Sequence, residues 1–173
     1  TMNFGKAVNS ALIKKYATFK GRACRAEWWY FLLFSVLVTL GATIIVSFFT
    51  FSSLDIEYLS TLNEDQAAQY TLESDFGKAL SWTSIAIGLA LFLPSFAVTV
   101  RRLQDLDASY FWALPYLVTG LIGLWISFFP SATDSMIRLD ALSNIIFIIY
   151  CIAFFRRGSF DDNRFGSDPL ETK

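Results

Sequence analysis

Three long stretches of the sequence contain no charged residue, and they are the strongest constraint on how this chain can fold. They cover residues 28–54, 79–100 and 108–133. A helix needs about 20 apolar residues to cross a hydrocarbon layer about 30 Å thick, and each stretch is that long. A core helix of a small soluble protein usually keeps one polar face, which these stretches lack. The sequence therefore predicts an integral membrane protein.

A fourth apolar run, residues 141–155, is too short to cross a membrane alone. Extending it back to Met136 gives a full span, with Arg138 and Asp140 near its outer end. Charged side chains near a helix end can reach the headgroup region, so these two charges are compatible with a span. We therefore predict one all-α membrane domain over residues 1–173, a bundle of four transmembrane helices at about residues 28–51, 79–100, 110–130 and 137–155.

The overall composition agrees with this prediction. Hydrophobic residues make up 54% of the chain and charged residues 17%, whereas an average soluble domain is about 45–50% apolar and about 25% charged. The first apolar run is longer than the core of a cleaved signal peptide, about 7–15 residues, so we expect it to be kept as a span. The 2 cysteines, Cys24 and Cys151, do not suggest a disulfide framework.

The lysines and arginines outside the predicted spans lie mainly in alternate segments. Six precede the first span, two lie between the second and third spans and four follow the fourth, whereas the other two loops contain one each. Short loops on the cytoplasmic side of a membrane collect Lys and Arg. We therefore expect a bacterial inner (cytoplasmic) membrane protein with both termini in the cytoplasm, including the tail of residues 156–173.

The longest predicted loop, residues 52–78, would then face the periplasm, and it is acidic. It contains 6 Asp and Glu residues, with Lys78 as its only cation. Asn63 is a suitable cap for a short helix that runs to about Leu72. The acidic excess fits either a solvated, exported loop or a surface that binds a cation or a basic partner.

Residues 3–20 show the periodicity of an amphipathic helix. Apolar residues recur at spacings of three or four positions, namely Phe4, Val8, Leu12, Tyr16 and Phe19. A basic helix with an apolar edge can lie in the membrane interface, which is the location we predict. The alternative is packing against the cytoplasmic ends of the spans.

The first predicted span carries a weakly polar stripe. Ser35, Thr39, Thr43 and Ser47 recur every four residues and therefore lie on one side of a helix. Small and hydroxylated residues in membranes favour close packing and hydrogen bonds between helices. A wetted path for a solute is the alternative interpretation of this stripe.

Proline occurs in the second and third predicted spans, at Pro94 and Pro115. A proline inside a membrane helix leaves a carbonyl without its helical donor, and a neighbouring group must satisfy it. We expect kinks that serve helix packing at these positions, with a gate or a binding site as the alternative.

Three segments of the sequence together resemble a known family. They are Tyr16–Phe34 (YATFKGRACRAEWWYFLLF), Arg101–Leu114 (RRLQDLDASYFWAL) and Gly158–Leu170 (GSFDDNRFGSDPL). They resemble the bacterial inner-membrane family known as domain of unknown function 805, and the resemblance covers nearly the whole chain outside the acidic loop. The middle segment departs from the family pattern, because Gln104 stands where a His is usual and residues 107–109 replace a Gly- and Arg-rich turn. The family has no established general activity, so the resemblance implies a topology and a membrane location and leaves the function open.

All three segments lie on the predicted cytoplasmic side, and we expect their polar residues to converge into one cluster below the bundle. The candidate members are Arg22, Arg25, Glu27, Arg101, Arg102, Asp105, Asn163, Arg164 and Asp168. Arginine binds carboxylates and phosphates through two parallel hydrogen bonds. The cluster therefore fits either an internal network of ion pairs that clamps the tail, or a site for an anion such as a lipid headgroup, a nucleotide or an acidic partner segment.

Signals for catalysis are weak in this sequence. It contains no histidine, the commonest acid–base residue in catalysis, and no Gly-rich phosphate loop. Asp105 and Asp107 could hold a metal only with help from other segments. We therefore expect no enzymatic activity, no cofactor and no nucleic acid partner.

A membrane-embedded binding or interaction protein is the preferred interpretation. Its cytoplasmic cluster would engage membrane lipids or another envelope protein in a regulatory or protective role, such as immunity to a membrane-acting toxin, or the chain would associate with itself as a homo-oligomer. The alternative is a channel or transporter for ions or small solutes. Three predicted spans contain no ionisable residue and four helices leave little room for a pore, so this alternative requires an oligomer.

Overall fold

The computed structural model describes residues 2–129 and 134–170, except that the side chains of residues 134–137 are not described. The described residues form helices and turns, without a β-strand. The last residue of the third predicted span, the first side chain of the fourth and residues 171–173 of the predicted tail lie outside the described part.

Three helices in the described part are long and apolar enough to cross a membrane. They are α2 (Arg25–Thr50) with the short 3-10 turn η2 (Phe51–Ser53), α5 (Asp75–Asp105), and the 3-10 turn η3 (Tyr110–Ala113) with α6 (Leu114–Phe128). The predictions of an all-helical fold and of the first three apolar helices are confirmed. A fourth long helix, α7 (Asp134–Phe154), occupies the place of the fourth predicted span.

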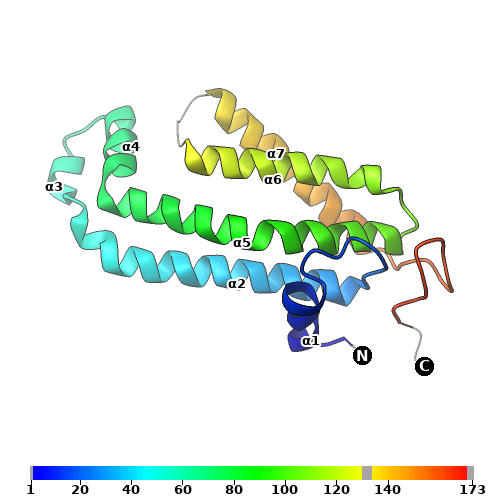
Figure 1. Ribbon diagram of the computed structural model, residues 1–173. Helices are drawn as coiled ribbons and strands as arrows, with labels where there is room; N and C mark the ends of the chain where they lie inside the picture. The colour runs from blue at the N-terminus through cyan, green and yellow to red at the C-terminus, as the bar shows by residue number, and fades with distance from the viewer. Residues whose placement is uncertain (1, 130–133, 171–173) are drawn as a thin grey trace.

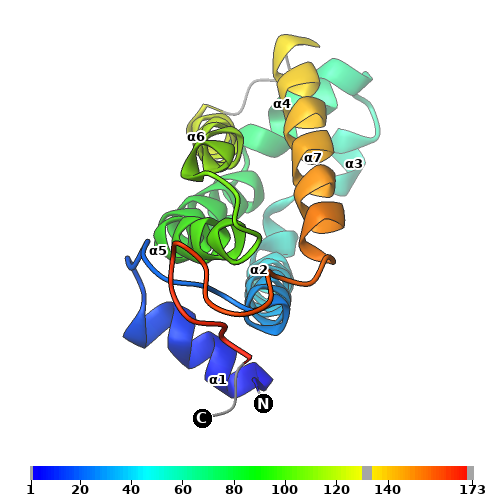
Figure 2. The same ribbon diagram turned by 90° about the vertical axis from the view of Figure 1, so that its right-hand side faces the viewer.

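The long helices lie beside one another and alternate in direction along the chain, running between the left and right sides of Figure 1. α2 packs along α5, α6 lies on α5, and α7 packs against α6 (Figures 1 and 2). The first helix, α1 (Phe4–Asn9), and the C-terminal tail after α7 lie at one end of the bundle, which we call the tail end. The short helices α3 (Ile56–Leu59) and α4 (Glu64–Glu73) lie at the opposite end, which we call the loop end.

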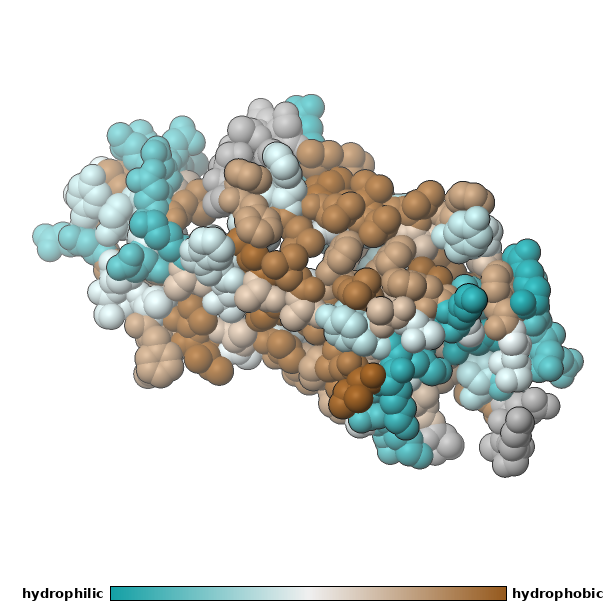
Figure 3. Space-filling model, viewed as in Figure 1, coloured by the Kyte–Doolittle hydropathy of each residue, from teal (hydrophilic) through white to brown (hydrophobic). Residues whose placement is uncertain are grey.

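Apolar side chains cover the middle of the molecule on the face seen in Figure 3, between more polar ends. Several of the largest are almost free of protein contacts, and Phe48 of α2 is 80% exposed. Trp125 of α6 and Ile152 of α7 are more than half exposed as well. So much exposed apolar surface fits a hydrocarbon surrounding.

The N-terminal helix is shorter than predicted. α1 continues as one π-helical turn, η1 (Ser10–Lys14), and the helical path ends at Lys15. The predicted helix over residues 3–20 is therefore wrong in its last part. The fully buried residues of this segment are Ala7 and Ala11, and α1 contacts α2. Small side chains on one side of a helix let two backbones approach closely, which favours the packing alternative.

The chain leaves the helical path where Tyr16 turns towards α5. Pro94 has no amide hydrogen, so the carbonyl of Ala90, four residues earlier, lacks its helical donor. The hydroxyl of Tyr16 donates to this carbonyl at 2.9 Å, and α5 continues through Pro94 as one helix. Pro115 lies in the first turn of α6, where a missing amide hydrogen does no harm, so the kink predicted there is absent.

The predicted loop between the first two spans is largely helical. Asn63 caps α4 as predicted, because its side chain accepts from the Gln66 amide at 2.9 Å. The Gln66 side chain in return accepts from the Asn63 amide at 3.3 Å. The turn into α5 is tight, since a Cβ at Gly77 would lie 2.1 Å from the carbonyl oxygen of Thr71.

Candidate functional site

The last part of α5 is a run of nine buried residues at the tail end, Ala97–Asp105. It includes Arg101 and Arg102, whose side chains are fully enclosed. A buried charge is unfavourable unless an opposite charge and hydrogen bonds compensate it. The partners of these two arginines therefore define the site.

One carboxylate, that of Asp105, is shared by two arginines. Arg22 donates to its Oδ1 at 2.9 Å, and Arg102 donates to its Oδ2. None of these three side chains is more than 4% exposed. The carboxylate therefore joins the segment before α2 to the end of α5.

The same two arginines also hold the backbone of the C-terminal tail. Arg102 donates to the carbonyl of Phe154 at 3.1 Å and to that of Arg156. The last carbonyls of a helix have no partner within it, so Arg102 also satisfies the end of α7. Arg22 donates to three tail carbonyls, at 2.5, 2.6 and 3.3 Å, those of Ser159, Asp161 and Gly166.

Three tail residues, Gly158, Ser159 and Asn163, fit closely against this arrangement. A Cβ at Gly158 would lie 2.1 Å from Oδ2 of Asp105, so a larger residue would displace the shared carboxylate. The Ser159 amide donates to the Asp105 carbonyl at 2.8 Å. Asn163 donates to the Gln104 carbonyl at 2.9 Å. The tail is therefore an ordered part of the site.

A second buried ion pair joins α2 to α5. Arg101 donates to Oε1 of Glu27 at 2.8 Å, and Ser10 of η1 donates to the same oxygen at 2.9 Å. Gln104, at the position where the resembled family usually has His, donates to the carbonyl of Phe19 at 2.9 Å. The N-terminal segment is thus tied to both helices beside the arginines.

Three of the nine predicted site residues lie outside this interior. Arg164 pairs with Asp107 at 3.0 Å, and both side chains are more than half exposed. Arg25 is exposed and donates at 3.2 Å to a carbonyl just beyond α7. Asp168 accepts a local tail amide at 2.9 Å. The other six form what we call the buried cluster: Arg22, Glu27, Arg101, Arg102, Asp105 and Asn163.

Every charged group of the buried cluster has an opposite charge within it. This is the geometry of an internal clamp.

Cys24, beside the cluster, is 2% exposed, and its burial raises the pKa of the thiol above the ordinary value. In the part of the chain that the structure describes, no three His, Cys, Asp or Glu side chains are placed to hold a metal ion.

An additional feature of the tail end, which we call the tail groove, was not predicted. It lies between the α5–α6 turn, η3 and α7 and has a volume of about 850 Å³. Leu103, Trp112 and Ile149 contribute to its mostly apolar wall, and Arg156 and Arg157 line it where the tail begins. Both arginines are exposed, and neither forms an ion pair with another described residue. The arginine pair directly after the fourth apolar run is a sequence signal for the charged end of this groove, but not for its apolar wall.

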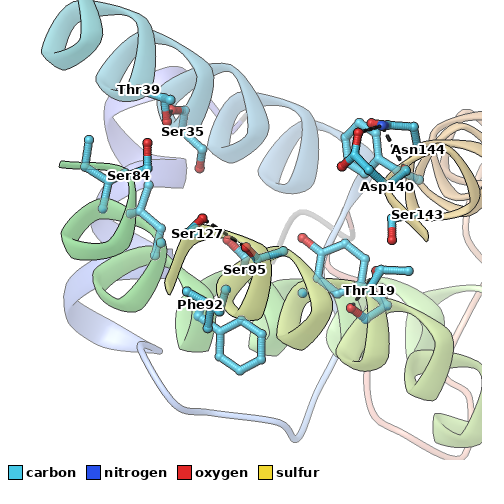
Figure 4. A pocket seen from close by; sticks show the side chains of 18 residues that line it. Ser35, Thr39, Ser84, Phe92, Ser95, Thr119, Ser127, Asp140, Ser143 and Asn144 are labelled. Atoms are coloured by element: carbon cyan, nitrogen blue, oxygen red, sulfur yellow. Dashed lines mark hydrogen bonds between the residues drawn. The ribbon is translucent and has the colours of Figure 1, made fainter. Parts of the chain in front are cut away.

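A second hollow, which we call the hydroxyl cavity, lies between α2, α5, α6 and α7 (Figure 4). Its volume is about 470 Å³, and all four helices contribute hydroxyl groups to its wall. Ser35 and Thr39 of the predicted stripe line this cavity, whereas Thr43 and Ser47 line a separate surface hollow. Asp140, predicted only as a charge near the end of a span, also lies in the wall.

Comparison with known proteins agrees with the resemblance of the sequence segments. The family model described as protein of unknown function (DUF805) matches residues 16–167. Inner membrane protein YhaH of Escherichia coli (strain K12) is 31% identical over 158 residues, which are 91% of this chain and 92% of the relative. Inner membrane protein YhaI of the same strain is 28% identical over 159 residues, which are 92% of each chain. No solved structure matches the chain.

Proposed function

This chain belongs to the DUF805 family, and we propose that it is a non-enzymatic inner-membrane protein whose tail groove binds an anionic phospholipid. The observation that carries the proposal is the pair Arg156 and Arg157 at one end of an apolar groove. The ligand class follows from the charge of this pair and from the apolar wall beside it.

In this proposal α2, α5, α6 and α7 each cross the membrane, and both termini lie in the cytoplasm. α7 has 21 residues, enough for a helix to cross about 30 Å of hydrocarbon. The first helix and the tail lie at the same end of the bundle, as an even number of crossings requires (Figure 1). The excess of Lys and Arg in the segments at this end supports its cytoplasmic location.

The unpaired charge at the tail end favours a negatively charged ligand. The three arginines of the buried cluster have carboxylate partners, and Arg164 has one on the surface. Arg156 and Arg157 have none among the described residues. A basic residue near a membrane surface attracts anionic lipid by about 1 kcal/mol, and a guanidinium can bind a phosphate through two hydrogen bonds.

The wall of the groove favours a ligand that also has an apolar part. Leu103, Trp112 and Ile149 come from three different elements and offer apolar contacts beside the arginines. A phospholipid combines a phosphate with an acyl chain, and its chain can follow the groove along α7 into the hydrocarbon layer. A nucleotide or an acidic peptide would leave this apolar wall without a matching group.

The buried cluster has a supporting role in this proposal. Arg102 holds the carbonyl of Arg156, and the Ser159 amide is held by the Asp105 carbonyl. These bonds fix the backbone on both sides of Arg157. A binding group that is already fixed in place loses less freedom on binding, so the cluster strengthens a site to which it does not itself contribute a contact.

Native mass spectrometry of the protein released from lipid discs tests the proposal. The discs contain equal amounts of phosphatidylglycerol and phosphatidylcholine. We expect the protein to retain phosphatidylglycerol preferentially. The double variant Arg156→Gln/Arg157→Gln should bind it roughly 30-fold more weakly, since two contacts of about 1 kcal/mol are removed.

Arg164→Gln is the matched control, because Arg164 is an exposed arginine at the same end that already has a carboxylate partner. It should retain phosphatidylglycerol like the unchanged protein. Equal retention of the two lipids, or unchanged retention by the double variant, would contradict the proposal. A copurifying protein in place of the lipid would assign the groove to a protein partner.

A further inference from the structure

We propose that the hydroxyl cavity binds a small organic cation with a primary ammonium group, which reaches it from the loop end of the bundle. The cavity shares no lining residue with the tail groove. The proposal therefore adds a second site to the protein and does not depend on lipid binding.

Three glycines line this cavity, and one of them leaves part of it open. A Cβ at Gly120 would lie 2.6 Å from the ring of Phe92, and one at Gly88 would lie 3.0 Å from Leu124, so α5 and α6 approach each other closely at these points. A Cβ at Gly123, about one turn further along α6, would meet no atom within 4 Å. Gly123 therefore faces open space, and a larger residue there would fill the cavity without a clash.

Five of the eight hydroxyl groups around the cavity are already used as donors. Each of the five donates to a backbone carbonyl of its own helix, at 2.9–3.0 Å: Ser35, Thr39, Thr119, Ser127 and Ser143. A hydroxyl has one hydrogen, so these oxygens have only lone pairs left for a ligand. An ammonium group has three donors and no acceptor, which matches such a wall.

A carboxylate adds a negative charge to this wall. Asp140 accepts a hydrogen bond from Asn144 at 3.1 Å, and both side chains face the cavity in Figure 4. Asp140 forms no ion pair with any described residue. Arg138, two residues earlier in α7, is exposed and forms no ion pair with Asp140 either. Among the described residues no cation pairs with Asp140, and a cationic ligand would neutralise it.

The cavity spans the middle of the bundle, and its carboxylate lies towards the loop end. Ser127 is next to the last residue of α6, and Asp140 lies near the start of α7, so both belong to the half of the bundle next to the loop end. Residues 52–78, which form the loop end, contain 6 acidic residues and one lysine. A surface of one sign next to a cleft raises the local concentration of ions of the opposite sign.

The size of the cavity separates an organic cation from a bare metal ion. A volume of about 470 Å³ is within the range of small-molecule sites, about 300–1,000 Å³. A bound Ca²⁺ instead needs about six to eight oxygens at about 2.3–2.6 Å, in a compact shell. Only one carboxylate lines this cavity among the described residues. The wall therefore fits a small amine that uses several separate acceptors.

Isothermal titration calorimetry of the full chain in phosphatidylcholine discs tests the proposal, with ethanolammonium as the probe and ethylene glycol as a neutral molecule of similar size. We expect saturable binding of ethanolammonium and no binding of ethylene glycol. Asp140→Asn keeps the shape and removes the charge, so it should weaken binding by roughly tenfold or more. Gly123→Leu fills the cavity and should abolish binding.

Two controls match these variants. Asp161→Asn removes an exposed carboxylate in the tail, and Gly41→Leu adds a side chain to α2 where a Cβ also meets no atom within 4 Å. Both should bind ethanolammonium normally. Equal binding of ethylene glycol, or unchanged ethanolammonium binding by Asp140→Asn, would overturn the proposal. The Arg156→Gln/Arg157→Gln variant should lose lipid and keep the amine, which distinguishes failure of one site from failure of the other.

Discussion

The tail end and the loop end of the bundle use polar side chains in opposite ways. At the tail end, polar groups bond between segments far apart in the sequence, and Arg22 and Asp105 are 83 residues apart. Towards the loop end, Ser127 and Ser143 each bond to a carbonyl four residues away in their own helix. Burial differs in the same way along α5: its last nine residues, at the tail end, are all buried, whereas only Gly77 and Ile85 are buried in its first half, towards the loop end.

The contrast shows how one bundle can fix the positions of its segments at one end and keep hydrogen-bond acceptors free towards the other. Hydrogen bonds across segments make the position of each segment depend on the others, so they specify the fold. Hydrogen bonds within one helix leave the neighbouring helices free of that constraint and leave lone pairs available to a ligand. The two ends should therefore respond very differently to substitution.

Asp105→Asn should have the largest effect on stability. It leaves the guanidiniums of Arg22 and Arg102 buried without their shared negative charge, and breaking a buried pair costs about 3–5 kcal/mol. Reversible unfolding in mixed micelles would measure the loss. Asp107→Asn is the control, since its pair with Arg164 is exposed and such pairs contribute about 0.2–1 kcal/mol. Similar losses of unfolding free energy in both variants would show that the buried carboxylate contributes no more to stability than an exposed one.

Cys24 gives a local measure of the same change. It is 2% exposed and burial raises the pKa of its thiol, so it should react with a water-soluble maleimide only slowly near neutral pH. Its reaction rate should rise at a more alkaline pH than that of a free thiol. In a Cys151→Ser background, Asp105→Asn should speed the labelling roughly a hundredfold. Unchanged labelling would mean that the tail end stays closed without the carboxylate.

Gly158→Ala should destabilise the protein by about 1–3 kcal/mol, the usual cost of overpacking. The new methyl group would lie 2.1 Å from Oδ2 of Asp105, which is held in place by two arginines. The same unfolding experiment measures the change. Gly41→Ala, where a Cβ meets no atom within 4 Å, should be neutral or stabilising. If the two substitutions changed the free energy of unfolding equally, close packing around Gly158 would not contribute to stability.

Tyr16→Phe should cost about 1 kcal/mol, because the Ala90 carbonyl loses its donor. A double-mutant cycle with Pro94→Ala checks the cause. The amide of an alanine at position 94 can donate to this carbonyl within the helix, so Tyr16→Phe should cost less in that background. An unchanged cost would show that Tyr16 stabilises the fold through other contacts.

Ser127→Ala should change the free energy of unfolding by less than about 0.5 kcal/mol. Its hydroxyl bonds only within α6, and the carbonyl that it leaves belongs to an intact helix. The same substitution should nevertheless weaken ethanolammonium binding, since the cavity loses one acceptor. A large loss of stability would show that polar groups towards the loop end stabilise the fold as much as those at the tail end do.

The sequence was sufficient for features that depend on neighbouring residues. The apolar runs predicted α2, α5 and α6, and Asn63 predicted the start of α4, because length, apolar content and capping are local properties. It also indicated which polar segments belong to the tail end. It did not indicate which distant partners pair, since nothing in the sequence matches Arg101 with Glu27 or Arg22 with Asp105.

The features that were predicted wrongly or missed also depend on contacts between segments far apart in the sequence. The periodicity of residues 3–20 continues through Tyr16, but the structure ends the helix at Lys15, and Tyr16 bonds to a carbonyl exposed by a proline 78 residues later. The tail groove and the hydroxyl cavity were also missed. Each is formed by segments that meet only in the folded chain, so no single stretch of the sequence carries its pattern.

The arginine that closes the tail end is synthesised early, and most of its acceptors are synthesised late. Arg22 precedes the first long helix, whereas three of its acceptors are the carbonyls of Ser159, Asp161 and Gly166. On the ribosome, this end of the protein therefore stays open until α7 has been made and the tail has returned to the start of α2. Synthesis of residues 159–166 is therefore required before Arg22 can reach its full set of acceptors and hold the tail against α5.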